Sequence, residues 1–190
     1  STYFVDAPST MNELLMAHYL LKTNPDPRFR RWVLSCMIGN TYYHNFVTHL
    51  MEAAYQRKVY QIVDAGGSVN AETLTRLMKE TLQSFWGEDV EISDDAAYTW
   101  MRQPHYYMGL YSYTYSAGLT VATQVCKRIE KEGQCAVDDW KKVLAAGSTL
   151  DPAGLARLAG IDITTDAPLL DTIAYIGEII DEIERLTDSL

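Results

Sequence analysis

A histidine and a cluster of tyrosines lie together in one short stretch of this chain. The run 104–118 holds His105 and five tyrosines, Tyr106, Tyr107, Tyr111, Tyr113 and Tyr115. Phe or Leu would fill a core without a hydroxyl that needs a partner. Phenol and imidazole groups are instead hydrogen-bond donors, and donors that converge on one point stabilise an oxyanion or hold a peptide backbone. This run is therefore a candidate catalytic or binding surface.

If the run is helical, the spacing of the tyrosines places them on two different faces of the helix. Tyr106 and Tyr113 then share one face, and Tyr107, Tyr111 and Tyr115 form a second stripe. We expect His105, Tyr106 and Tyr113 to face a cleft. Tyr107 and Tyr111 are candidates for substrate binding. The alternative for this second stripe is core packing with a bonded hydroxyl, which we prefer for Tyr115.

Two carboxylates lie near the N-terminus. Asp6 precedes Ala-Pro-Ser, and Glu13 follows on the next predicted helix. Thr10 and Glu13 have the spacing of a capping box, in which both side chains satisfy backbone N–H groups at a helix start. On composition alone, Asp6 precedes the cap and Glu13 is the capping acid.

The other histidines give no metal-binding motif. The sequence contains no HExxH, and His44 and His49 are five residues apart, which puts them on different helix faces. His18 lies on an apolar face, as a core histidine does. We therefore expect structural or surface roles for these three histidines and no complete metal site within the chain.

Composition narrows the class of protein. The net charge of −9 argues against binding nucleic acid, whose phosphates need a basic surface. No uncharged apolar run reaches the roughly 18 residues that a membrane-spanning helix needs. The three cysteines have no CxxC spacing, which favours a reducing, cytoplasmic setting over a disulfide framework.

Hydrophobic periodicity and helix breakers predict an all-α chain that forms a single domain over residues 1–190. Strand signals are lacking, and glycines or prolines end most of the periodic segments. The expected helices cover residues 10–22, 28–63 with a kink at Gly39, 71–85, 94–101, 104–131, 137–146, 151–160 and 166–186.

Several motifs occur in an order that resembles a known family. They are the segment 6–13, the tyrosine-rich run, the stretch 145–162 with its Gly-Ser, Asp-Pro and Gly-x-Asp, and the closing amphipathic helix. The long helix around 42–61 agrees more loosely. Together they resemble zinc metallopeptidases of the thimet oligopeptidase type, and most closely the oligoendopeptidase F branch. The resemblance spans nearly the whole chain.

The resemblance implies a fold and roles for particular residues. The fold would be the multi-helix C-terminal portion of a zincin-type oligopeptidase catalytic domain. Asp6 stands where the family has a Glu as third zinc ligand, and Asp can also bind zinc through oxygen. Glu13 would orient a zinc histidine or remain the capping acid. His105, Tyr106 and Tyr113 would polarise the scissile carbonyl, and Tyr107 and Tyr111 would contact the substrate.

The family's two zinc histidines and its catalytic glutamate lie upstream of the segment where this chain begins. We therefore expect the C-terminal part of a larger enzyme that binds one zinc ion and hydrolyses short peptides. The isolated chain would be inactive, without zinc, and able to self-associate through exposed apolar surface.

Two other interpretations stay open. A non-catalytic helical module could bind a peptide or protein through the tyrosine-rich groove, which the missing HExxH and the Asp in place of Glu both favour. Alternatively, the chain is a helical interaction domain whose tyrosines are structural.

Overall fold

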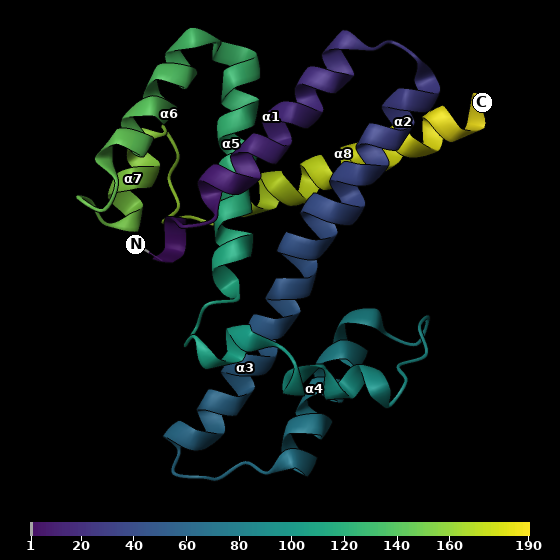
Figure 1. The fold of residues 1–190 in the computed structure, drawn as a ribbon, viewed down its shortest axis with the longest axis vertical. Coiled ribbons are helices and arrows are strands. Elements are labelled where there is room, and N and C mark those ends of the chain that lie inside the picture. Colours follow the sequence, from purple (N-terminus) through teal and green to yellow (C-terminus); the bar gives the residue numbers. More distant parts are fainter. Residues whose placement is uncertain (1) are drawn as a thin grey trace. The chain divides into compact units, whose positions relative to one another are not determined.

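The computed structural model describes residues 2–190, and the regular elements in this range are helices (Figure 1). The predicted all-α class is confirmed. The α-helices are α1 (Ala7–Thr23), α2 (Pro27–Cys36), α3 (His49–Asp64), α4 (Ala71–Trp86), α5 (Tyr113–Glu132), α6 (Gln134–Ala146), α7 (Pro152–Leu158) and α8 (Ala167–Asp188). Shorter or differently wound helices are η1 (Thr2–Phe4), η2 (Met37–Thr48), η3 (Asp95–Met101) and η4 (Pro104–Tyr107).

Polar caps and glycines set many of these boundaries. The side chains of Asp26, Asn70 and Asp151 each accept a hydrogen bond from a backbone N–H in the first turn of α2, α4 and α7. Gly133 separates α5 from α6 and has a φ of +66°, which glycine adopts without strain.

The chain forms two compact units. The first comprises Ser1–Phe46 and Thr114–Leu190, and the second comprises Val47–Tyr113. The first unit has a core of fully buried side chains that includes Met11, Leu14, Leu119 and Val125. Here α2 packs against α1 and α8, and α6 packs against α7. The single domain over 1–190 stays a prediction.

The second unit is built around α3 and α4, which pack against each other, while η3 packs against α4. Its core consists of Tyr55, Leu77 and Met78. Trp100 and Tyr106 pack against this core, and Nε1 of Trp100 donates a hydrogen bond to Thr75 Oγ1. The short helices η3 and η4 are therefore attached to the α3–α4 pair by aromatic packing.

The predicted helix over 104–131 is wrong in its first third. Residues 104–107 form the short helix η4, residues 108–112 are not helical, and α5 begins only at Tyr113. Gly109 has a φ of +70°, which a right-handed helix cannot contain. The two tyrosine stripes inferred from ideal helical spacing therefore do not exist.

The capping box at Thr10 and Glu13 is also wrong. Helix α1 begins at Ala7 with Asp6 in the N-cap position, and Pro8 occupies the first turn, where its missing N–H costs nothing. Thr10 lies inside the helix, buried, and its hydroxyl donates to the carbonyl of Asp6 at 2.9 Å. The capping role predicted for Glu13 is thereby removed.

The long helical stretch predicted over 28–63 is present as α2, η2 and α3 in direct succession. The expected kink at Gly39 is replaced by η2, a π-helix of 12 residues. A π-helix hydrogen-bonds from each residue to the fifth along, so it changes which side chains share a face. Helical periodicity alone could not reveal this shift.

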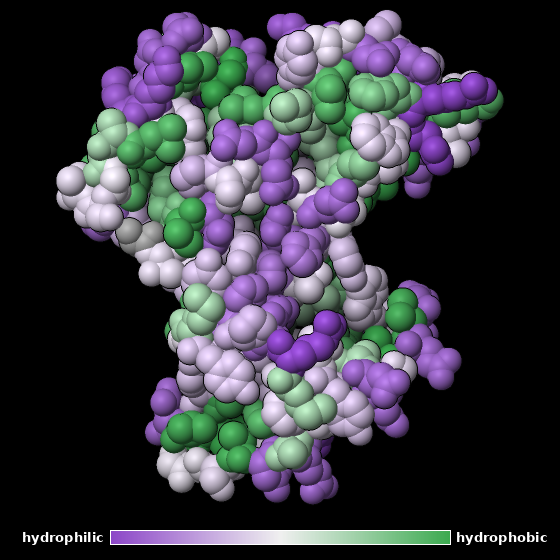
Figure 2. All heavy atoms as spheres, in the orientation of Figure 1, coloured by the Kyte–Doolittle hydropathy of each residue, from purple (hydrophilic) through white to green (hydrophobic). Residues whose placement is uncertain are grey.

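Hydrophobic side chains reach the surface of each unit, interspersed with hydrophilic ones (Figure 2). Large exposed examples include Trp32, Phe85, Met101, Leu110 and Leu170. Self-association through such side chains stays a prediction. Within residues 2–190, no helix combines the length and apolar character needed to cross a membrane.

Candidate functional site

Asp6 is held at the start of α1 in the first unit. Its carboxylate does not cap the helix. Instead, Oδ2 accepts a hydrogen bond from Oγ1 of Thr114 at 3.1 Å, and Thr114 is fully buried in the first turn of α5. The carboxylate is thus oriented by a hydroxyl from a distant part of the chain, as metal-binding carboxylates commonly are.

A glycine in α5 allows this approach. A Cβ atom built on Gly118 would lie 2.8 Å from the backbone nitrogen of Ala7 and 3.0 Å from the carbonyl carbon of Asp6. Both are backbone atoms, which cannot rotate away. Gly118 therefore fixes how closely α5 packs against the backbone that carries Asp6.

Glu13 lies two turns further along α1 and interacts with η2. Its Oε2 accepts a hydrogen bond from Oγ1 of Thr41 at 2.8 Å. Both residues line a pocket of the first unit, together with Met16, Trp32, Cys36 and His44. Glu13 is an exposed residue, so it remains accessible to a further partner.

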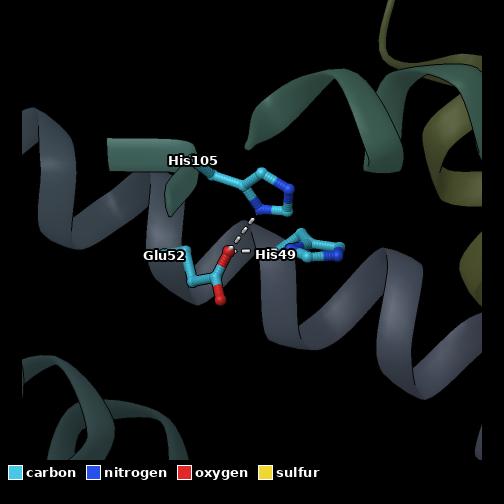
Figure 3. A group of neighbouring side chains, drawn as sticks. All are labelled: His49, Glu52 and His105. Atoms are coloured by element: carbon cyan, nitrogen blue, oxygen red, sulfur yellow. Dashed lines mark hydrogen bonds and ion pairs between the residues drawn. The ribbon is translucent and has the colours of Figure 1, made fainter. Parts of the chain in front are cut away.

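His105 lies in the second unit beside a buried carboxylate that the sequence did not single out. Nδ1 of His49 donates a hydrogen bond to Oε2 of Glu52 at 2.7 Å, and Nδ1 of His105 lies 3.8 Å from the same oxygen (Figure 3). Nε2 of Gln103 donates to the other oxygen, Oε1. His49, Glu52 and His105 thus form one cluster, in which one potential ligand atom from each residue lies within 4.8 Å of the others.

The cluster keeps Glu52 ionised although its side chain is only 7% exposed. Burial pushes the pKa of Glu52 upward, but hydrogen bonds from His49 and Gln103 and the electrostatic interaction with both imidazoles lower it below its ordinary value. Glu52 is therefore a fixed negative charge facing two imidazoles. Such a group can orient a histidine, hold its proton or bind a cation.

Tyr106 and Tyr111 lie near the cluster, and their rings pack against different residues. The ring of Tyr111 lies 5.3 Å from that of His105 between centroids. The ring of Tyr106 lies 5.2 Å from that of Tyr55, and its hydroxyl is buried without a hydrogen-bond partner among the described residues. Burial, and to a lesser extent Glu52 and Tyr55, raise the pKa of Tyr106, so its phenol stays protonated. Tyr106 has the surroundings of a core residue.

Tyr107 and Tyr113 are more exposed. The side chain of Tyr107 is 81% exposed and that of Tyr113 is 37% exposed. Tyr113 lines an open groove of the second unit with residues of α3, among them Leu50, Ala53, Arg57, Lys58 and Gln61, and with Leu110. Tyr113 therefore borders a groove of mixed apolar and basic character.

The structure thus places the predicted site residues in two different units. Asp6 and Glu13 belong to the first unit, and His105 and the four candidate tyrosines belong to the second. Sequence reasoning missed Glu52, Gln103 and the partnership of His49 with His105. The signal available was His49-x-x-Glu52, because residues three apart share a helix face.

Comparison with known proteins assigns the family. The model of Peptidase family M3 matches residues 1–175. The chain belongs to peptidase family M3. The family is zinc-dependent in general. Oligopeptidase PepF of Bacillus subtilis (strain 168) is 28% identical over 98% of the chain, and the oligoendopeptidase F homolog of Borreliella burgdorferi is 25% identical over 98% of it. The resemblance to oligoendopeptidase F is confirmed.

A solved structure supports the fold. The crystal structure of oligoendopeptidase-F from Enterococcus faecium superposes with a TM-score of 0.86 over 97% of this chain, at 24% identity. The chain spans 28% and 31% of the lengths of the two curated relatives and 36% of the crystallised chain. The match therefore shows that this chain has the fold of a part of that structure.

Proposed function

We propose that this chain is the C-terminal part of a zinc metalloendopeptidase that hydrolyses short oligopeptides. The observation that carries the proposal is the placement of Asp6 at the start of α1, oriented by Thr114 rather than used as a cap. It stands in the segment whose motif resembles that of oligoendopeptidase F. Membership of peptidase family M3 supports peptide hydrolysis as the reaction.

The residues of this chain fit one ligand position of a zinc site. A carboxylate oxygen is a usual zinc ligand, and one oxygen of Asp6 is already hydrogen-bonded, which leaves the other for an ion. Zinc bound there and at two upstream histidines would acidify a water molecule and polarise the peptide carbonyl. Glu13, fixed by Thr41, would orient one of those histidines.

The second unit would supply the donors for the developing oxyanion. The imidazole of His105, held near Glu52, and the hydroxyl of Tyr113 would hydrogen-bond to the carbonyl oxygen as it gains charge. Tyr107 and Tyr111 would contact the substrate backbone. Tyr106 is proposed for the same wall, where its buried ring would hold η4 against Tyr55.

The chain by itself would not hydrolyse peptides. It contains no HExxH, and therefore lacks two zinc ligands and the general base. We expect it to act with the upstream part of the enzyme in the cytoplasm, which the free cysteines favour, and with one catalytic zinc ion per full-length protein.

A non-catalytic role is the second candidate. The groove lined by Tyr113, Leu50 and Arg57 has the mixture of apolar and basic side chains that a peptide with a free carboxylate would contact. Asp6 is one methylene shorter than the Glu of the family motif, which also favours this candidate. In that case the chain would bind peptides without zinc.

The two candidates differ in turnover and in the effect of a chelator. The full-length protein and the chain 1–190 should be incubated with an internally quenched peptide of about eight residues. We expect turnover by the full-length protein, its loss with a chelator, its return with Zn²⁺, and none from residues 1–190. Peptide binding that survives the chelator, without turnover, would support the non-catalytic module.

A further inference from the structure

The cluster of His49, Glu52 and His105 has the composition of a metal site that is separate from Asp6. We propose that these three residues bind a divalent transition metal ion, with zinc as the best fit. Two imidazoles and one carboxylate form the ligand set of several zinc sites with an open position for water or substrate. All three residues belong to the second unit, so the site needs nothing from the first.

The distances suit an ion with small movements. A tetrahedral zinc site with bonds of about 2.0–2.2 Å places neighbouring ligand atoms roughly 3.3 Å apart. Nδ1 of His49 now lies 2.7 Å from Oε2 of Glu52, and Nδ1 of His105 lies 3.8 Å from it. One separation must widen and the other shorten by about half an ångström, which side-chain rotation supplies without backbone change.

Both imidazoles direct Nδ1 toward the carboxylate (Figure 3). His49 and Glu52 share one face of α3, and His105 reaches them from η4. Tyr106 packs on Tyr55 and thereby fixes η4 against α3. The ligand atoms are therefore gathered by the fold before any ion arrives, which lowers the ordering cost of binding.

A neighbouring amide fixes the carboxylate. Nε2 of Gln103 donates to Oε1 of Glu52 and leaves Oε2 toward the imidazoles. Hydrogen bonds of this kind orient metal-binding carboxylates. The side chain of Glu52 is buried and that of His105 is 20% exposed, so the ion would enter beside His105 and keep at least one water ligand.

The proposal is compatible with the role of His105 in catalysis but does not depend on it. An ion would occupy Nδ1 of His105 and leave Nε2, on the opposite edge of the ring, to donate a hydrogen bond (Figure 3). The competing account is a carboxylate hydrogen-bonded by imidazoles that needs no ion.

The test uses the chain 1–190, which has four histidines, His18, His44, His49 and His105. Zn²⁺ is titrated while the imidazole signals are followed by nuclear magnetic resonance. We expect saturable changes at His49 and His105 with one equivalent of ion, and unchanged signals from His18 and His44. Uniform weak shifts, or none up to millimolar Zn²⁺, would overturn the proposal without any variant having to fold.

A second test measures the Zn²⁺ affinity of variants by calorimetric titration. His105→Ala should lower Zn²⁺ affinity more than 10-fold, and Gln103→Ala, which loses an orienting bond, by roughly 10-fold. The matched control is His44→Ala, an exposed histidine, which should leave affinity unchanged. Asp6→Ala should also leave it unchanged. Binding lost with Asp6→Ala and retained with His105→Ala would place the ion at Asp6 and reject this site.

Discussion

The carboxylate of Glu52 accepts a 2.7 Å hydrogen bond from Nδ1 of His49, one turn away on α3. Both residues are buried, and a second imidazole, that of His105 on η4, lies near the same carboxylate. A charge at this depth needs such partners, since an unpaired buried carboxylate would be costly. Glu52 is therefore a buried charge that interacts with three side chains of the second unit, those of His49, Gln103 and His105.

Replacing Glu52 should destabilise the protein. Glu52→Ala removes the acceptor that the buried His49 and the half-buried Gln103 share, at a cost of about 1–3 kcal/mol. Urea unfolding measures the change. The matched control is Glu80→Ala, because Glu80 forms an exposed pair with Arg76 and should cost less than about 0.5 kcal/mol. Equal effects of the two changes would show that the cluster contributes nothing special.

The close approach at Gly118 gives a second prediction. Gly118→Ala forces a methyl group against the backbone of Asp6 and Ala7, and should destabilise by about 1–3 kcal/mol. Gly177 in α8 has open space around its Cβ position, so Gly177→Ala should instead stabilise by about 0.5–1 kcal/mol. Thermal unfolding of both variants checks the signs. A neutral Gly118→Ala would mean that α5 does not constrain Asp6.

The all-helical architecture could be predicted from sequence, but its local windings could not. Caps such as Asp151 act within one turn, so the α7 start is visible in the sequence. The positive φ of Gly109 and the π-winding of η2 depend on tertiary packing, which no local periodicity encodes. This is why the tyrosine run was predicted as one helix and is instead η4, a loop and α5.

Substitutions at two tyrosines should distinguish a catalytic role from a packing role. Tyr113→Phe in the full-length protein removes the hydroxyl of a groove-lining residue and should lower kcat about 10²–10³-fold with little change in Tm. Tyr106→Phe removes a buried hydroxyl without a partner among the described residues, and should leave Tm equal or higher. Steady-state kinetics and calorimetry decide. A Tm loss in Tyr113→Phe with unchanged kcat would assign Tyr113 to packing.

The three thiols should react in order of exposure. Burial, with a smaller contribution from Glu130, raises the pKa of Cys126 from 9.0 to about 12, whereas Cys135 is exposed. At pH 8 an aromatic disulfide reagent should therefore label Cys135 quickly and Cys126 only after unfolding. Because the folded pKa is the higher one, Cys126 stabilises the fold below pH 9.0, and this contribution is lost as pH rises toward 12. Fast labelling of Cys126 in the native protein would contradict its burial.

The sequence could predict only those residues of the candidate site whose type and motif indicate a chemical role. Asp6 and His105 stand out because carboxylates and imidazoles in such motifs do chemistry, and their roles stay predictions. Glu52 did not stand out, since a lone glutamate on a helix is ordinarily solvated. Its importance comes from His105 on η4, a contact made only by the fold.

The central claim is that Asp6 is a zinc ligand of a peptidase. It is tested most directly by measuring zinc content and peptide turnover in the full-length protein and comparing the unmodified protein with Asp6→Ala and Asp26→Ala. Asp26 also stands at a helix start, so it controls for loss of a carboxylate there. We predict that Asp6→Ala loses the one zinc ion bound beside Asp6 and its peptide hydrolysis, while Asp26→Ala retains both. Unchanged zinc and turnover in Asp6→Ala would contradict the assignment of Asp6 as a zinc ligand.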